Sequence, residues 1–533
     1  MVKQNLKYSH KYLYFTLFLS IVASFSLSSA RSARPAKITE VKTFGQGELR
    51  IIEGIPFLKL TGTYYEMGEQ YGSLLKDEFQ KIYQDLLPYK TALATKYPSD
   101  IQDQFEKLTS PKFIQQLKGM AAGSGLPYGD LLLGNYMAII ERGGCSSILA
   151  KIIDKDKKPG FLHGRNNDYG KGTGKFPVVV EYHPEGEFKH IAIGVVASAG
   201  LSEGMNERGL TVSGNLAPGD LRNRRIQNAS PDMKLREILS VASSLKDVGA
   251  LMKDYACDVG NTFTIGSGDE TDGVIFDVNY ENVRKNHFQN TSAIFATNGF
   301  VHEDLNPGRN DLRYQIIERY VHEGKVNSVD GMIEVLSDPG TSFGVNNPST
   351  IHSVVFDPKN KTIYMAFNTK FAAWGQWLKY EWEKDLVTVY READKEKFQN
   401  ADAAELREVH IIGAHWSGSL PVMGGGPRSN EPNFWVEIKE WLKEKNAEQL
   451  SVFRERAARE IILKAKDKPD VKATITRGMI ATEKFRGFMF KVINVDIPKL
   501  EPNIPYTIHV ENTSAVYRWI VDHGVTLTKP AVK

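Results

Sequence analysis

The stretch ERGGCSSIL, residues 141–149, divides the chain into two parts with different hydrophobic patterns. Before it, apolar residues recur at spacings of three and four, which predicts helices over 63–92, 111–120 and about 128–139. Residues 48–62, ELRIIEGIPFLKLTG, are strand-like. After the stretch come short alternating segments, which predict strands: CSSILAKI, GFLHGRN, FPVVVEYH, HIAIGVVAS and GLTVSGN. Cys145 therefore lies at the junction of a mostly helical part and a strand-rich part.

The elements beyond this junction occur in groups. Helices are predicted over 232–254, 309–323 and 328–337, and strands over 262–267, 273–279 and 293–297. IHSVVFDP and TIYMAFN then form a hairpin. Strands grouped apart from helices predict a layered α+β fold rather than a βαβ winding. For 379–533 the pattern predicts an accessory region with helices over 379–407 and 434–466 and strands over 471–496 and 506–526.

Composition excludes several classes of protein. The 533 residues are 41% hydrophobic and 25% charged, which is typical of a globular protein. The net charge of +3 gives no support for nucleic-acid binding. Only two cysteines occur, Cys145 and Cys257, so a disulfide scaffold and a four-cysteine zinc site are both excluded.

The N-terminus has the three-part pattern of a secretory signal peptide. Lys3, Lys7 and Lys11 precede an apolar run over 12–27, and the small residues Ser28, Ser29 and Ala30 follow. We therefore expect residues 1–30 to be removed and the protein to be exported, either periplasmic or secreted (lysosomal or extracellular in a eukaryote). An uncleaved membrane anchor is the alternative. No other stretch is long and apolar enough for a transmembrane helix, so none is expected after signal removal.

The position of Cys145 favours a nucleophile. Two glycines before it allow close approach of the backbone, which the thiol needs if it is to attack its own preceding peptide bond. Polar residues that could support it follow at predicted strand ends and at the start of a helix: Arg165, Asp168, Asn215, Asn298 and Arg313. Taken singly, each has a simpler interpretation, because a lone cysteine is usually a small buried apolar residue and Asn-Gly is usually a turn.

The order of these motifs resembles the penicillin acyltransferase family of cysteine N-terminal-nucleophile (Ntn) hydrolases, which is related to choloylglycine hydrolase and acid ceramidase. The resemblance covers roughly 50–370 and runs in order through GTYYEMGEQYGSLL, LKGMAAGSGLPYGDLLLGNY, GGCSS, HGRNNDYG, EGMNERGL, ATNGF and HSVVFDPKNKTIYMAF. Two positions depart from the family pattern: Ser146 stands where threonine is common, and Gly299 where histidine often follows the asparagine. Both bear on substrate identity.

The resemblance implies a four-layer αββα sandwich and a precursor that cleaves itself between Gly144 and Cys145. The segment 31–144 would become a separate, mostly helical chain that stays as a partner, 145–378 would be the catalytic core, and 379–533 would be an accessory region. The new α-amine of Cys145 would act as the base for its thiol. This is chemically reasonable because an α-amine titrates near ~7.7–8.0 and a thiol near ~8.5.

Roles for the other residues also follow from the resemblance. Asp168 would orient the new amine, and Arg165 would favour the thiolate. Asn215 and Asn298 would donate to the oxyanion, where one donor can lower the barrier by ~3–4 kcal/mol. Arg313 would complete the charge network, with Arg309 as the competing choice. No cofactor and no metal are implied.

The expected activity is cleavage of a linear carbon–nitrogen amide, or transfer of its acyl group, through a Cys145 thioester. The substrate would be a small-molecule amide or, as in ceramidase-like members, a lipid amide. Hydrolysis and transfer to an amine acceptor both remain open. A non-catalytic binding protein on the same scaffold is a further alternative.

Overall fold

The computed structural model describes residues 34–84, 101–137, 144–153, 156–169, 173–217, 230–256, 260–279, 283–289, 291–302, 305, 311–340, 344–398, 407–417, 433–440, 459–483, 487–496, 500–510, 517–521, 525–529 and 531. The chain forms two compact units, 1–393 and 394–533. The predicted signal peptide, 1–30, lies outside the described residues. None of the helices within the described ranges has the length and apolar character needed to cross a membrane.

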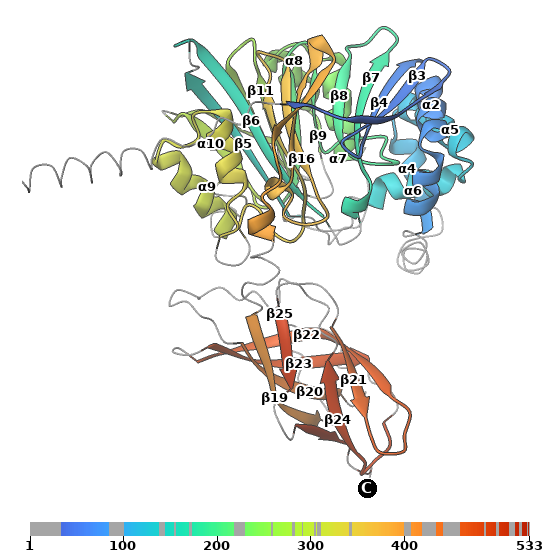
Figure 1. The fold of residues 1–533 in the computed structure, drawn as a ribbon, viewed down its shortest axis with the longest axis vertical. Coiled ribbons are helices and arrows are strands. Elements are labelled where there is room, and N and C mark those ends of the chain that lie inside the picture. The colour runs from blue at the N-terminus through green and yellow to red at the C-terminus, as the bar shows by residue number, and fades with distance from the viewer. Residues whose placement is uncertain are drawn as a thin grey trace, which may run out of the picture. The chain divides into compact units, whose positions relative to one another are not determined.

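Two β-sheets lie at the centre of the first unit (Figure 1). Among the described residues, the first sheet has the order β1 (Arg34–Pro35), β18 (Leu386–Arg391), β17 (Trp377–Glu381), β16 (Thr362–Phe367), β15 (Thr350–Asp357), β6 (Pro159–Asp168), β5 (Gly144–Ile153) and β14 (Ala293–Ala296). The second has the order β13 (Val283–His287), β12 (Asp272–Val278), β11 (Asn261–Ser267), β10 (Leu210–Leu216), β9 (Glu203–Asn206), β8 (His190–Val195), β7 (Pro177–Pro184), β4 (Ile55–Gly62), β3 (Gly47–Ile52) and β2 (Ile38–Phe44).

Helices cover the outer face of each sheet. Those packed with the second sheet are α2 (Tyr64–Leu74), α5 (Pro111–Ser124), α7 (Pro231–Val241) and α8 (Leu245–Met252), with α4 (Ile101–Leu108) and α6 (Tyr128–Met137) beside them. Those on the first sheet are α9 (Leu312–His322) and α10 (Val329–Leu336). Helix α2 begins where the sequence predicts, because Thr63 and Glu66 form a capping box.

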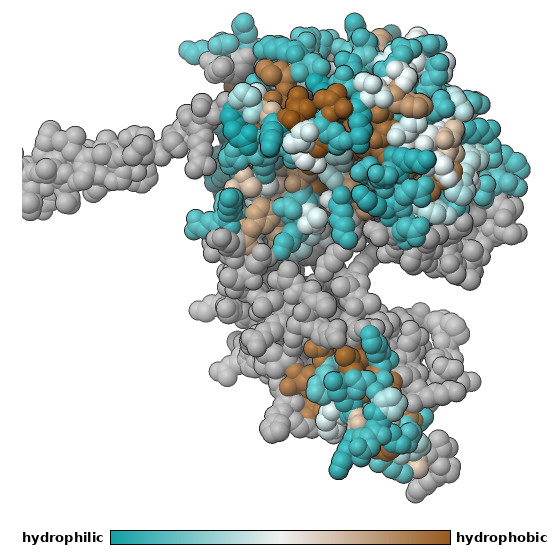
Figure 2. Space-filling view, turned by 45° about the vertical axis from the view of Figure 1, so that its right-hand side comes forward, coloured by the Kyte–Doolittle hydropathy of each residue, from teal (hydrophilic) through white to brown (hydrophobic). Residues whose placement is uncertain are grey.

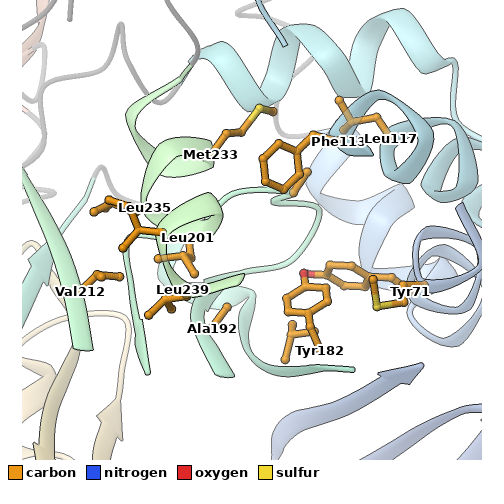
Figure 3. Packing of buried hydrophobic residues seen from close by; sticks show 14 of the residues in the cluster. Tyr71, Phe113, Leu117, Tyr182, Ala192, Leu201, Val212, Met233, Leu235 and Leu239 are labelled. Atoms are coloured by element: carbon orange, nitrogen blue, oxygen red, sulfur yellow. The ribbon is translucent and has the colours of Figure 1, made fainter. Parts of the chain in front are cut away.

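Three apolar cores lie between these layers. One lies between the two sheets and includes Phe57, Ile193 and Phe356. The other two join each sheet to its helices, and Figure 3 shows part of the larger one, with Tyr71 and Phe113 from the helices and residues of the strands. The described surface in Figure 2 is mainly hydrophilic, interrupted by small apolar patches. The order helix, sheet, sheet, helix is the αββα sandwich that the resemblance implies.

The predicted strands and helices between 145 and 368 are present, but two boundaries need correction. The core predicted over 145–378 does not end at 378, because β18 continues the first sheet and Val387 and Val389 are buried between the sheets. The segment 31–144 is less helical than expected, since 34–62 forms four strands before the first helix. A strand over 38–44 was not predicted, because every residue of it is exposed and it has no buried face.

The described part of the second unit is mainly one sheet, with helical residues at 395–398. Within the described part of 394–533 its order is β25 (Tyr517–Val521), β19 (Arg407–Ser417), β20 (Asn433–Glu440), β23 (Gly487–Asp496), β22 (Val471–Glu483), β21 (Arg459–Lys464), β24 (Pro505–Val510) and β26 (Thr526–Thr528). The predicted helices over 379–407 and 434–466 are wrong over most of their described residues, although 395–398 are helical as predicted. Residues 386–391, 433–440 and 459–464 pair with neighbouring strands, and this pairing outweighs their helix-like charge content.

Candidate active site

Cys145 is the second residue of β5, inside the first sheet. Its side chain is buried, with 6% of the residue exposed. Its backbone N–H donates to Asn298 Oδ1 at 2.6 Å, which fixes the peptide between Gly144 and Cys145 from the side of β14. The predicted cleavage bond is therefore held in an ordered strand.

The pairing of β5 with β6 brings the HGRNND motif next to the nucleophile. The two strands are antiparallel, with Gly144 opposite Asp168, Cys145 opposite Asn167 and Ser147 opposite Arg165. The hairpin thus places both predicted charged residues beside Cys145 by backbone register alone.

Arg165 contacts the thiol directly. Its Nη2 lies 3.1 Å from Cys145 Sγ, and its Nη1 contacts Asn215 Oδ1 and lies 3.3 Å from Ser147 Oγ. Burial raises the pKa of the Cys145 thiol, and Arg165 opposes this effect without cancelling it. This environment favours the neutral thiol.

Asp168 and Arg313 form an ion pair beside Gly144 and Cys145. Asp168 accepts from Asn347 Nδ2 and Thr350 Oγ1, both at 2.7 Å, and pairs with Arg313 Nη1 at 3.2 Å. The same Nη1 lies 3.2 Å from the Cys145 carbonyl oxygen. Burial raises the pKa of the Asp168 carboxyl, and Arg313 and the two side-chain donors oppose that rise.

Arg313 is held by its own helix terminus. Asp311, the N-cap of α9, accepts from the Arg313 backbone and from its Nε and Nη2. Arg313 Nη2 also donates to Asn298 Oδ1 at 2.8 Å. The preferred arginine thus joins the site, whereas the competing Arg309 lies outside the described residues.

The structure brings all six predicted site residues together. Asn215 Nδ2 donates to the Ala296 carbonyl at 3.1 Å, and Asn298 Nδ2 donates to the Leu216 carbonyl at 2.7 Å. Both amides are engaged within the protein in the uncut chain. Their role as oxyanion donors stays a prediction, as do the roles of the other four.

Sequence reasoning missed a set of polar partners of these residues. Those in direct contact with them are Ser147, Glu203, Asp311, Asn347 and Thr350. His352 contacts Glu203, and all of these partners except Asp311 are buried. Glu203 and His352 fall inside the quoted EGMNERGL and HSVVFDP motifs, each as a polar residue at the start of a strand-like run. A polar residue in a predicted buried strand indicates that it has a hydrogen-bond or ion-pair partner, but the sequence does not identify that partner.

The described residues contain no group of three or more His, Cys, Asp or Glu side chains that could hold a metal ion. Cys257 lies outside the described residues.

Residues 154–371 match the family model of acyl-coenzyme A:6-aminopenicillanic acid acyl-transferase. This part of the first unit matches the penicillin acyltransferase family. The match spans β6 to β16 and includes five of the six predicted site residues, with Cys145 just before it. It confirms the resemblance found in the motifs, and it supports amide hydrolysis or acyl transfer as the general class of reaction.

The penicillin acyltransferase match is accompanied by two curated relatives from Dictyostelium discoideum. Protein dcd1A is 29% identical over 159 residues, which are 25% of this chain and 36% of the relative. Protein dcd1B is 26% identical over 165 residues, 25% of this chain and 33% of the relative. The matched stretch therefore spans about a third of each relative.

Solved structures with some likeness cover less than half of this chain. A Caenorhabditis elegans N-acylethanolamine-hydrolyzing acid amidase ortholog gives a TM-score of 0.33 at 18% identity, covering 40% of this chain and 93% of that one. Penicillin V acylase from Agrobacterium tumefaciens gives a TM-score of 0.32 at 14% identity, covering 44% of this chain and 91% of that one. A conjugated bile acid hydrolase from Clostridium perfringens gives a TM-score of 0.30 at 11% identity, covering 46% of this chain and 96% of that one.

Proposed function

We propose that this chain is an exported, self-processing cysteine amidase that acts through a thioester on Cys145. The observation that carries the proposal is the set of polar and charged side chains around the peptide bond between Gly144 and Cys145. The Cys145 thiol lies against Arg165, the Cys145 N–H is held by Asn298, and Asp168 and Arg313 lie beside Gly144.

The proposed self-cleavage is an attack by Cys145 Sγ on the Gly144 carbonyl carbon. The carbon–nitrogen bond breaks, the thiol proton passes to the leaving nitrogen, and a thioester joins Gly144 to the sulfur. Water then hydrolyses the thioester. It releases Gly144 as a carboxylate, and Cys145 is left with a free thiol and a free α-amine.

The new amine would form next to Asp168. A Cβ added to Gly144 would lie 2.9 Å from Asp168 Oδ2, so that carboxylate already borders the place that Gly144 leaves. Because burial keeps the thiol protonated, turnover needs a nearby base, and an α-amine near ~7.7–8.0 is suited to that task at neutral pH.

In turnover the amide substrate would take the place of the Gly144 peptide. Its acyl group passes to Cys145 Sγ, its amine leaves with the proton held by the α-amine, and water releases the acid. An amine in place of water would give acyl transfer. Export favours hydrolysis, because acyl thioester donors are scarce outside the cytoplasm.

The segment before the cut would stay bound as a partner chain. Strand β4 pairs with β7 in the second sheet, and α2 and α5 contribute Tyr71, Phe113 and Leu117 to its core. Burial of this kind stabilises a complex without a covalent link. Two chains should therefore copurify after cleavage.

The deciding experiment is intact-mass and N-terminal analysis of the purified protein beside Cys145→Ala. We expect a chain that begins at Cys145 in the wild type and one uncut chain without amidase activity in the variant. The matched control is Cys257→Ala, which removes the other thiol and should leave both cleavage and activity intact. Amide hydrolysis by an uncut Cys145→Ala protein would contradict the mechanism.

The substrate class can be separated with the same protein. N-acyl amino acids and N-acyl sphingosines, offered side by side, distinguish a small-molecule amidase from a lipid amidase. Adding hydroxylamine as an acceptor would trap the acyl group from Cys145 as a hydroxamate, which reports the thioester directly.

A further inference from the structure

Behind Arg165 lies a buried acid–base pair to which the mechanism above gives no role. Glu203 Oε2 lies 3.4 Å from Arg165 Nε, and its other oxygen contacts His352 Nε2. Glu203, His352 and Arg165 are exposed by 0%, 1% and 1%. Glu203 begins β9 in the second sheet and His352 lies in β15 of the first, so the pair crosses the interior of the sandwich.

The guanidinium of Arg165 thus lies between two groups that could neutralise it. On one side is the Glu203 carboxylate, and on the other is the Cys145 sulfur at 3.1 Å. A buried cation needs an anion close by, since burying an uncompensated charge is costly. If the Glu203 carboxylate is ionised at rest, it compensates Arg165, and the Cys145 thiol can keep its proton.

The charge count at the site favours the carboxylate. Two guanidinium groups, Arg165 and Arg313, contact three carboxylates, those of Glu203, Asp168 and Asp311. No positive charge is therefore left over for a thiolate. The raised pKa of the Cys145 thiol agrees with this count.

We propose that Glu203 is a positioning residue that serves as the resting counter-ion of Arg165, keeps the Cys145 thiol protonated, and is itself held in place by His352. The proposal rests on the proposed function only for the use of the thiol, because the ion pairs exist in the uncut chain.

Other titratable groups lie near Arg165. Asp168 interacts with it electrostatically but is compensated by Arg313. His163 is buried, and burial lowers its pKa to about 3, so it stays neutral. Burial raises the pKa of Asp232 to about 7, with Glu203 adding to the rise, so this carboxyl is largely neutral below that pH. Glu203 is therefore the anion whose removal should change Arg165 most.

The test is the pH dependence of Cys145 alkylation by iodoacetamide, read by mass spectrometry of the Cys145 peptide. In Glu203→Gln the side chain keeps its size but loses its charge, so the Cys145 sulfur, in contact with Arg165 Nη2, would gain most from ionising to a thiolate. We expect the alkylation midpoint to fall by at least about one pH unit, and the rate at pH 7 to rise about ten-fold.

Loosening of the fold would also speed alkylation, so the midpoint must be compared with a second value. In denaturant the same chain should titrate as an ordinary thiol, at about 8.5. A Glu203→Gln midpoint below the denatured value supports the proposal, because exposure alone cannot produce it. A midpoint at or above the denatured value overturns it.

Two further variants complete the design. Glu181→Gln removes another buried carboxylate of the second sheet, one that contacts His183 and Tyr380 rather than Arg165, and should leave the midpoint unchanged. His352→Gln should move the midpoint in the same direction as Glu203→Gln, but less. The same mass spectra show whether the chain is cut at Cys145, so a failure of self-processing is seen separately from a failure of this proposal.

Discussion

Gly144 is confined by the charged groups that surround the predicted cleavage bond. A Cβ at this position would lie 2.8 Å from Arg313 Nη1 and 2.9 Å from Asp168 Oδ2. Both distances are shorter than a carbon atom tolerates, and both charged groups are held by several partners. Any larger residue before Cys145 must therefore disturb the Arg313–Asp168 pair.

We predict that Gly144→Ala slows self-cleavage at least about ten-fold, since even a small displacement of catalytic groups is costly. The measurement is the fraction of uncut chain against time after refolding, followed on a denaturing gel. Gly194→Ala is the control, because a Cβ there meets nothing within 4 Å, and it should cleave at the wild-type rate. Equal rates for the two variants would show that the contacts at Gly144 do not matter.

The sequence could predict that the six site residues come together, but it could not predict their partners. Cys145, Arg165 and Asp168 lie in motifs with recognisable order, and the β5–β6 register makes them neighbours. Asn347 and Thr350, which hold Asp168, come from a loop and strand about 180 residues later. Their side chains carry no periodic signal, so only the folded sandwich reveals the contact.

At the scale of elements, α2 and α5 pack through small residues. A Cβ on Gly68 would lie 2.1 Å from the Gln116 carbonyl oxygen, and one on Gly119 would lie 2.0 Å from that of Tyr65. Gly72 and Gly123 are equally close to the opposite helix, at 2.5 and 2.3 Å from its backbone oxygens. Glycines four apart on both helices thus allow their backbones to touch.

We predict that Gly68→Ala lowers the free energy of unfolding by about 2–3 kcal/mol, because the added methyl group meets backbone atoms that cannot rotate away. Thermal unfolding of the purified variant measures this. Gly249→Ala, also inside a helix, is the control: its Cβ meets only the end of a lysine side chain at 3.4 Å, and it should be neutral or stabilising by up to about 1 kcal/mol. Equal melting temperatures for both variants would contradict the role of the close contact.

The same helices show why part of the fold was predictable. Their apolar spacing predicts α2, α5 and α6, and alternation predicts the strands of the sandwich. The alternation in LVTVYR at 386–391 was overlooked because charged residues follow it, although Val387 and Val389 alternate inward. The strands of the second unit pair with distant segments, which single-sequence patterns do not report.

At the scale of the whole molecule, the site belongs to one unit. Every contact described around Cys145 comes from residues before 394, and the first unit closes with β18. We predict that a chain ending at Ala393 folds and cleaves itself at the rate of the full-length protein. If it does not, while the full-length chain does, residues 394–533 contribute to the site.

A chain ending at Leu378 provides the contrast. It lacks β18 and all but the first two residues of β17, and with them the buried Tyr380, Val387 and Val389. We expect this shorter chain to stay uncut and to aggregate, because it exposes a sheet edge and apolar surface from the centre of the sandwich. Size-exclusion chromatography beside the gel assay separates the two outcomes.

The groups around Cys145 come from very different distances along the chain. Arg165 is 20 residues away, Asn298 is 153 and Arg313 is 168. Bringing all of them to the thiol requires both sheets of the sandwich to assemble. Under the proposed self-cleavage, chain length on a denaturing gel would therefore report maturation: each cut molecule would have completed its sandwich at least once. The ratio of cut to uncut chain would then measure the fraction of molecules that have folded.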